Sequence, residues 1–158
     1  MILYHGSNKE IDVIDLSLSR PNKDFGKGFY LSSDKEQAVS FAKFKASSSG
    51  GNPVITAYSF DDAVMDSNEL KVKIFKEYSK EWAEFVFANR NSETGDSVHN
   101  YDIVYGPIAN DRVGVQVLRY IEHFITLEQF LENLRYMKGI TFQYFFGTKA
   151  AVEKLKKL

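Results

Sequence analysis

Two short segments of this sequence combine residue types suited to binding a small molecule at a strand end. In the first, His5 closes a short apolar stretch and is followed at once by Gly6 and Ser7. A histidine there offers a ring nitrogen to a ligand hydroxyl, and the glycine lets a ligand approach the backbone. In the second, two glycines precede Tyr30, whose ring offers a face for stacking a planar group. The same patterns are common in strands that bind nothing, so chemistry alone leaves both interpretations open.

Other chemistries find less support. His5, His99 and His123 form no i, i+4 pair and no His-Glu-x-x-His motif, so we expect no histidine metal site. Residues 24–26, Asp-Phe-Gly, echo the magnesium motif of kinases, but no His-Arg-Asp motif accompanies them in a chain too short for a kinase. The glycines at 26 and 28 lead into a strand and lack a third glycine before a helix, unlike a dinucleotide fingerprint. The absence of cysteine excludes disulfides, thiolate metal sites and a cysteine nucleophile.

Length and composition describe one ordinary globular domain, residues 1–158. The chain is 44% hydrophobic and 26% charged, and 20 basic residues against 21 acidic ones give a formal net charge of -1. This balance lacks the basic footprint of a protein that resides on nucleic acid, although it is compatible with a small nucleic-acid substrate. No basic region followed by an apolar stretch opens the sequence, and no apolar run approaches the roughly 18 residues of a membrane span. We therefore expect a cytoplasmic protein that does not associate with a membrane.

Strand and helix signals alternate along the chain and predict a mixed α+β fold. Apolar or alternating segments predict strands at residues 2–5, 28–31, 54–60, 70–74, 101–105 and 141–146. Helices are predicted at 34–45, at 80–90 after the cap Ser79, at 127–137, and from Thr148 to the chain end with Leu155 and Leu158 facing inward. Capping boxes are expected for Ser33 with Glu36 and for Thr126 with Gln129. Residues 47–53 are rich in serine and glycine and predict a flexible loop.

The two segments around His5 and Tyr30 resemble a known pair of motifs. Tyr-His-Gly-Ser at residues 4–7 and Gly-Lys-Gly-Phe-Tyr-Leu at 26–31 are similar to the first two signature motifs of ADP-ribosyltransferases of the histidine–tyrosine–glutamate type, which include the poly(ADP-ribose) polymerases. Nearly the whole chain resembles a bacterial family known as a domain of unknown function, placed in that superfamily and often encoded beside a small antitoxin. The likeness also covers residues 24–30, 81–82, 101–104, 106–111 and 143–146. It implies the ADP-ribosyltransferase fold, in which two small packed sheets surround an NAD cleft with flanking helices.

The resemblance also implies roles for individual residues. His5 would hydrogen-bond the adenosine ribose of NAD, the Gly6 backbone would hold the nicotinamide amide, and Tyr30 would stack on the nicotinamide ring. The glycosidic bond then breaks through an oxocarbenium-like transition state, whose positive charge the enzyme must stabilise. No metal takes part. The remaining expected NAD contacts are Ser7, Lys27, Gly28 and Asn110, with a solvated loop lysine as the alternative interpretation of Lys27.

The third motif departs from the family pattern. Where these transferases carry a glutamate, the last predicted strand offers Gln143, which accepts a hydrogen bond but brings neither negative charge nor a base. Because charge-assisted hydrogen bonds are roughly twice as strong as neutral ones, the loss is about 1–2 kcal/mol, or about 10-fold in rate. Asp111 is the candidate for the missing carboxylate, although Asn110 and Asp111 also suit a plain turn or a helix cap. Asp24 either orients the glycine turn or contacts the ligand.

The sequence thus predicts an NAD-dependent mono-ADP-ribosyltransferase acting on a protein or nucleic acid. Its role as the toxin of a toxin–antitoxin pair is implied by the resemblance alone. Two alternatives stay open. One is an NAD glycohydrolase, in which water is the acceptor. The other is a degenerate NAD-binding module that has lost its catalytic carboxylate, an interpretation favoured by Gln143.

Overall fold

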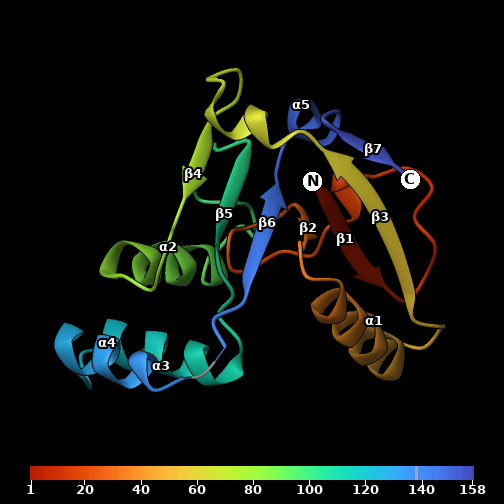
Figure 1. Cartoon of the computed structure of the whole chain (residues 1–158). Helices are drawn as coiled ribbons and strands as arrows, with labels where there is room; N and C mark the ends of the chain where they lie inside the picture. The colour runs from red at the N-terminus through yellow and green to blue at the C-terminus, as the bar shows by residue number, and fades with distance from the viewer. Residues whose placement is uncertain (138) are drawn as a thin grey trace.

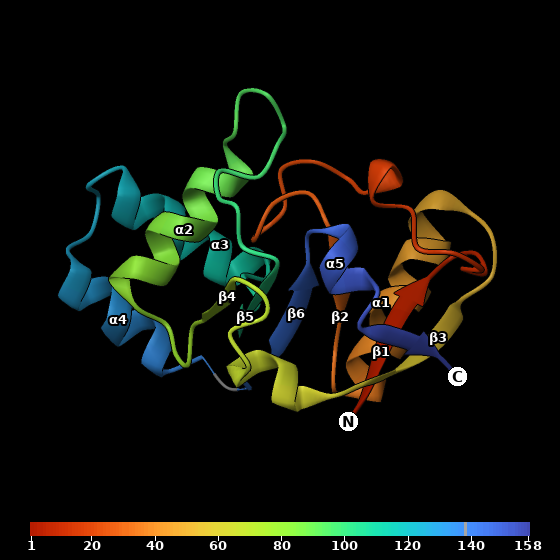
Figure 2. The ribbon, with the colours of Figure 1, turned by 90° about the horizontal axis from the view of Figure 1, so that it is seen from above.

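The computed structural model describes residues 1–137 and 139–158 and has the α+β architecture that the sequence predicts (Figure 1, Figure 2). The described residues form seven strands, five α-helices and two short 3-10 helices. The strands are β1 (Ile2–Ser7), β2 (Phe29–Leu31), β3 (Val54–Phe60), β4 (Val72–Ile74), β5 (Ile103–Pro107), β6 (Phe142–Phe146) and β7 (Leu155–Lys157). The α-helices are α1 (Lys35–Ser49), α2 (Lys80–Arg90), α3 (Asp111–Ile121), α4 (Leu127–Arg135) and α5 (Lys149–Val152), and the 3-10 helices are Leu16–Leu18 and Asp62–Asp66.

The strands make two small sheets that meet along β1 and β2. One sheet has the order β1-β3-β7 with antiparallel neighbours, and the other has the order β2-β6-β5-β4, in which only β4 and β5 run parallel. Tyr4 of β1 and Ser32, just after β2, exchange backbone N–H···O bonds of 2.8 and 2.9 Å. This bridge holds the two sequence motifs side by side, because His5 directly follows Tyr4 and Tyr30 lies two residues before Ser32.

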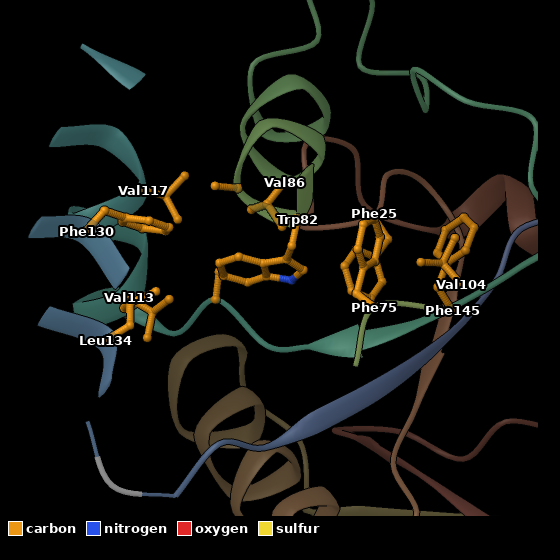
Figure 3. Packing of buried hydrophobic residues seen from close by; sticks show 12 residues of the cluster. Phe25, Phe75, Trp82, Val86, Val104, Val113, Val117, Phe130, Leu134 and Phe145 are labelled. Carbon is orange, nitrogen blue, oxygen red and sulfur yellow. The ribbon is translucent and has the colours of Figure 1, made fainter. Parts of the chain in front are cut away.

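Both faces of the four-stranded sheet are buried, each against different partners. Because side chains alternate along a strand, Phe145 of β6 joins the cluster beneath α2, α3 and α4, where Trp82 is fully buried (Figure 3). Phe146 faces the other way and packs with Leu3 and Phe60 of the three-stranded sheet. The second cluster therefore joins the two sheets, and the first attaches the helices.

Helix α1 packs directly against β1 at a glycine. A Cβ on Gly6 would lie 2.2 Å from the carbonyl oxygen of Ala38, so only glycine permits this approach of helix to strand. The cap of α1 is Asp34, whose carboxylate accepts from the amides two and three residues on, and the prediction of Ser33 as the cap is wrong by one residue. Both are good cap residues, but Asp34 has the extended backbone of a cap, and its amide donates to the Ser32 hydroxyl. The helix continues to Ser49, so the first residues of the predicted 47–53 loop are helical.

The chain end differs from its prediction. Instead of one helix from Thr148 to the last residue, α5 stops at Val152 and β7 pairs antiparallel with β3. The apolar spacing at the chain end resembles that of an amphipathic helix, but the outer edge of β3 has backbone groups that need partners. Pairing with Leu155–Lys157 satisfies them, so a tertiary requirement overrides the local signal.

The predicted caps of α2 and α4 are confirmed, and one helix, α3, was not predicted. Ser79 caps α2, and Thr126 with Gln129 forms the complete capping box of α4. The sequence pattern predicts no helix at α3, because this segment contains a glycine and several β-branched residues of low helix propensity. Within the described residues, no helix is both long and apolar enough to cross a bilayer.

Candidate functional site

A cleft of about 1010 Å³ lies where β1, β2 and α1 come together with the loop after β1 and the start of β6. Seven of the nine residues predicted to contact NAD or catalyse line this cleft. They are His5, Gly6, Ser7, Gly28, Tyr30, Asp111 and Gln143. The other two do not line it. The Lys27 amide donates to Ser97 instead, and the Asn110 side chain caps α3, the alternative role considered from sequence.

His5 presents a neutral imidazole to the cleft. Its Nδ1 lies 2.8 Å from the carbonyl oxygen of Tyr30, and because a carbonyl can only accept, Nδ1 carries the proton and donates. Burial lowers the pKa of His5 to about 4; the bond to Tyr30 opposes this shift, and Lys45 and Lys23 add to it. The ring is fixed further by stacking on Phe29, with centroids 4.2 Å apart. Nε2 is therefore an unprotonated acceptor, suited to receive a hydrogen bond from a ligand hydroxyl.

Tyr30, which lines the cleft, is held in place through its hydroxyl. The hydroxyl donates to the Gly26 carbonyl at 2.7 Å and accepts from the Phe25 amide at 3.0 Å, so the loop before β2 folds around it. Gly26 has φ +95°, a left-handed conformation that favours glycine, and a Cβ on Gly28 would lie 2.2 Å from the Phe145 ring. The glycine spacing of this motif thus serves the loop geometry. Burial raises the pKa of Tyr30 well above its ordinary value.

Gln143 is oriented by a buried carboxylate. Its side-chain Nε2 donates to Asp24 Oδ2 at 3.0 Å. Because an ionised carboxylate has no proton to give, the amide NH₂ of Gln143 must face Asp24, and its Oε1 is the end left to accept from a ligand. Asp24 is only 8% exposed. Its oxygens also accept from Arg90 Nε at 2.8 Å, from Arg90 Nη2 at 2.7 Å and from the Ala109 amide at 2.9 Å.

The network around Asp24 supports the first of the two roles that the sequence left open, orientation of the glycine turn. Asp24 also lines the cleft, so contact with a ligand stays a prediction. Asp24 ties the glycine loop to β6, to the end of α2 and to the segment before α3. Gly114 leaves room for the Arg90 side chain, because a Cβ on residue 114 would lie 2.6 Å from Arg90 Nη1. The sequence carried no signal for this network, since Arg90 and Gln143 are 66 and 119 positions away from Asp24. The only available hint was that a buried acid requires a basic partner.

Four cations line the cleft without a carboxylate partner. Lys9, Arg20, Lys23 and Lys45 all lie on its wall, and none forms an ion pair within 4.0 Å among the described residues. Burial, then the charge of Lys45, lowers the pKa of Lys23 to about 8. Burial and the charges of Arg20 and Lys9 lower the pKa of Lys45. In a chain of net charge -1, this local excess of positive charge favours an anionic ligand.

A buried hydroxyl of the first motif has no partner. Ser7 is 1% exposed, lines the cleft, and its Oγ makes no hydrogen bond within the described part of the chain. Such an atom costs stability unless a ligand or water satisfies it. A metal is less suited to the site, because no three metal-ligating side chains gather anywhere among the described residues.

Fold and site together define an α+β domain with a cleft at the junction of two sheets, lined by several cations. Residues 1–157 match the model of DUF3990, a family described as proteins of unknown function, and the chain belongs to that family. No curated protein and no solved structure matches it.

Proposed function

We propose that this protein is an NAD-dependent mono-ADP-ribosyltransferase that cleaves the nicotinamide glycosidic bond and transfers ADP-ribose to a protein or nucleic acid. The observation that carries the proposal is that His5, Tyr30 and Gln143, the three residues at the motif positions of such transferases, surround one cleft. They come from β1, β2 and β6, which are far apart in the sequence. If the resemblance of these short motifs were due to chance, there would be no reason for the three side chains to line the same cleft.

The groups of the cleft fit the parts of NAD. A dinucleotide carries a pyrophosphate, and the unpaired Arg20 and Lys45 offer it positive charge. His5 Nε2 is placed to accept from a ribose hydroxyl, and the Ser7 hydroxyl lacks a partner that a ligand would supply. The Tyr30 ring suits the positively charged nicotinamide, because a cation lies favourably on an aromatic face.

In the reaction, the bond between the ribose carbon and the nicotinamide nitrogen breaks, and nicotinamide leaves as a neutral molecule with the electron pair. Gln143 Oε1, held toward the cleft by Asp24, accepts from the ribose hydroxyl, and its dipole stabilises the positive charge that develops on the sugar. The acceptor atom then forms the new bond and releases its proton. Asp24 is poorly suited to take that proton, because Arg90 compensates its charge. Asp111, exposed at the start of α3 on the same cleft wall, is the candidate base.

A different observation favours a second candidate. Among the described residues, the carboxylate that Gln143 contacts is that of Asp24, which is bound to Arg90, so Gln143 brings no unpaired negative charge to the cleft. This arrangement suits a module that binds NAD without cleaving it. A macromolecular acceptor is expected only for the transferase. The same holds for a toxin role and for an antitoxin that restrains it.

The test is incubation of the protein with NAD labelled in its adenylate part and a bacterial lysate, followed by separation of protein, nucleic acid and free ADP-ribose. The His5→Ala variant reports on the cleft, and His123→Ala, on the surface after α3, is the matched control. Label in a macromolecular fraction with wild type and His123→Ala, but not with His5→Ala, supports the transferase. Label in free ADP-ribose alone identifies a glycohydrolase. NAD binding without consumption identifies the binding module, and the absence of both contradicts an NAD site.

A further inference from the structure

The side chain of Lys23 lies between two aromatic rings inside the cleft. Its Nζ is 4.6 Å from the ring centroid of Tyr30 and 5.6 Å from that of Phe41. Tyr30 belongs to β2 and Phe41 to α1, so the rings are brought to the same cation by different elements. We call the space between these two rings the ring slot.

The ammonium group is held there with few strong contacts. Within the described residues Lys23 forms no ion pair within 4.0 Å, and its Nζ donates no hydrogen bond to the protein. Lys45 and Arg20 repel it, and Asp24, which attracts it, is already bonded to Arg90. Its pKa, lowered to about 8 mainly by burial, reflects this poor compensation. The two aromatic faces are therefore the main favourable contacts of the Lys23 ammonium group. Because the lysine side chain is a flexible four-carbon chain, this group can move to another position.

We propose that Lys23 is an internal occupant of the ring slot, which a ligand must displace before its own planar ring can bind. This inference rests on the proposed function, because the oxidised nicotinamide of NAD is a planar ring with the same positive charge. The slot is then a site for a planar, cationic ring, and Lys23 lowers the apparent affinity for any ring that enters it.

The size of the effect follows from the strength of cation–π contacts. A partly desolvated contact of this kind corresponds to about 5- to 10-fold in an equilibrium constant. Removal of the side chain by Lys23→Ala is therefore expected to tighten ring binding about 5- to 10-fold. Because every ligand displaces the same occupant, the factor is the same for a charged ring and a neutral one.

The experiment measures the affinity of two probes by NMR titration: 1-methylnicotinamide, a cationic ring without phosphates, and nicotinamide, a neutral one. Wild type, Lys23→Ala and Lys23→Arg are compared, with Lys43→Ala as the control, because Lys43 is an exposed lysine of α1 that does not line the cleft. Both probes should bind Lys23→Ala more tightly by the same factor, and Lys23→Arg, which keeps a cation in the slot, should not gain. Lys43→Ala should leave the affinity for both probes unchanged. An unchanged affinity of Lys23→Ala, or a gain for the cationic probe alone, overturns the proposal, since the latter indicates charge repulsion instead of occupancy.

A second readout separates this inference from the proposed function. The ε-methylene protons of Lys23 should resonate upfield in the free protein because of the two ring currents, and they should move to their ordinary position when NAD saturates the cleft. If NAD binds and these signals do not move, displacement is wrong while the proposed function stands. If the ring probes behave as expected and NAD neither binds nor reacts, the proposed function is wrong while the ring slot stands.

Discussion

The orientation of Gln143 depends on Asp24, and the substitution Asp24→Asn tests this dependence. The new amide keeps the shape of the carboxylate, and its oxygen can still accept from Arg90. Its NH₂ group then faces two donors, the Ala109 amide and the Gln143 side chain. Gln143 must turn its amide over to accept this NH₂, which presents a donor to the cleft where the wild type presents an acceptor.

The magnitude can be worked out contact by contact. Loss of the charge on Asp24 weakens its bonds to Arg90, whose side chain is 34% exposed, so solvent screening limits this cost to about 1 kcal/mol. The Ala109 amide loses its acceptor, at a cost of about 1–3 kcal/mol. The free energy of unfolding should therefore fall by about 2–4 kcal/mol. The reversed polarity at Gln143 removes one hydrogen bond to the sugar, and kcat/KM should fall about 10- to 100-fold.

The assay is NAD turnover under saturating and limiting NAD, with calorimetric NAD affinity and denaturant unfolding of the same samples. Val117→Ala is the stability-matched control, because this residue of α3 is 3% exposed and does not line the cleft. Its loss should cost about 2 kcal/mol of stability without changing turnover. In a double variant, Asp24→Asn with Gln143→Glu, the amide and carboxylate exchange places and an acceptor faces the cleft again, so turnover should recover. The reasoning is refuted if the folded Asp24→Asn variant turns over NAD within a factor of two of wild type.

Three further predictions concern the same cleft. Tyr30→Phe removes the hydroxyl that donates to the Gly26 carbonyl, so the free energy of unfolding should fall by about 1–3 kcal/mol in denaturant titrations. An unchanged free energy of unfolding would show that this hydrogen bond does not stabilise the loop. His5 has a folded pKa of about 4, below its ordinary 6.5, so the unfolded chain takes up a proton first as the pH falls. Its contribution to stability is present above pH 6.5 and is lost progressively toward pH 4, by about 3 kcal/mol relative to His5→Ala; parallel stability profiles of the two proteins would contradict this. Gln143→Glu brings a second carboxylate against Asp24, and like charges raise the pKa of such a pair. This variant should therefore be less stable than wild type at pH 7.5 and recover as the pH falls to 5 in thermal unfolding, whereas a constant deficit would argue against a shared proton.

Much of the secondary structure could be predicted because its causes are local. The capping box of Thr126 and Gln129 needs only residues three positions apart, and Ser79 caps α2 in the same way. The alternation of apolar side chains predicted most strands to within about two residues. The two motifs around His5 and Tyr30 were recognisable for the same reason, since each lies within a few consecutive residues.

What only the tertiary structure decided depends on pairs that are distant in the sequence. The chain end became β7 because β3 had an open edge, which no local pattern records. Gln143 acquired its orientation from Asp24, and Asp24 its charge compensation from Arg90, through contacts that exist only after α2 and β6 have packed. The ring slot likewise requires β2 and α1 to be held at one distance by the core. A sequence specifies which groups are available, but their distances, burial and free lone pairs are set by packing, and those quantities decide what a site can do.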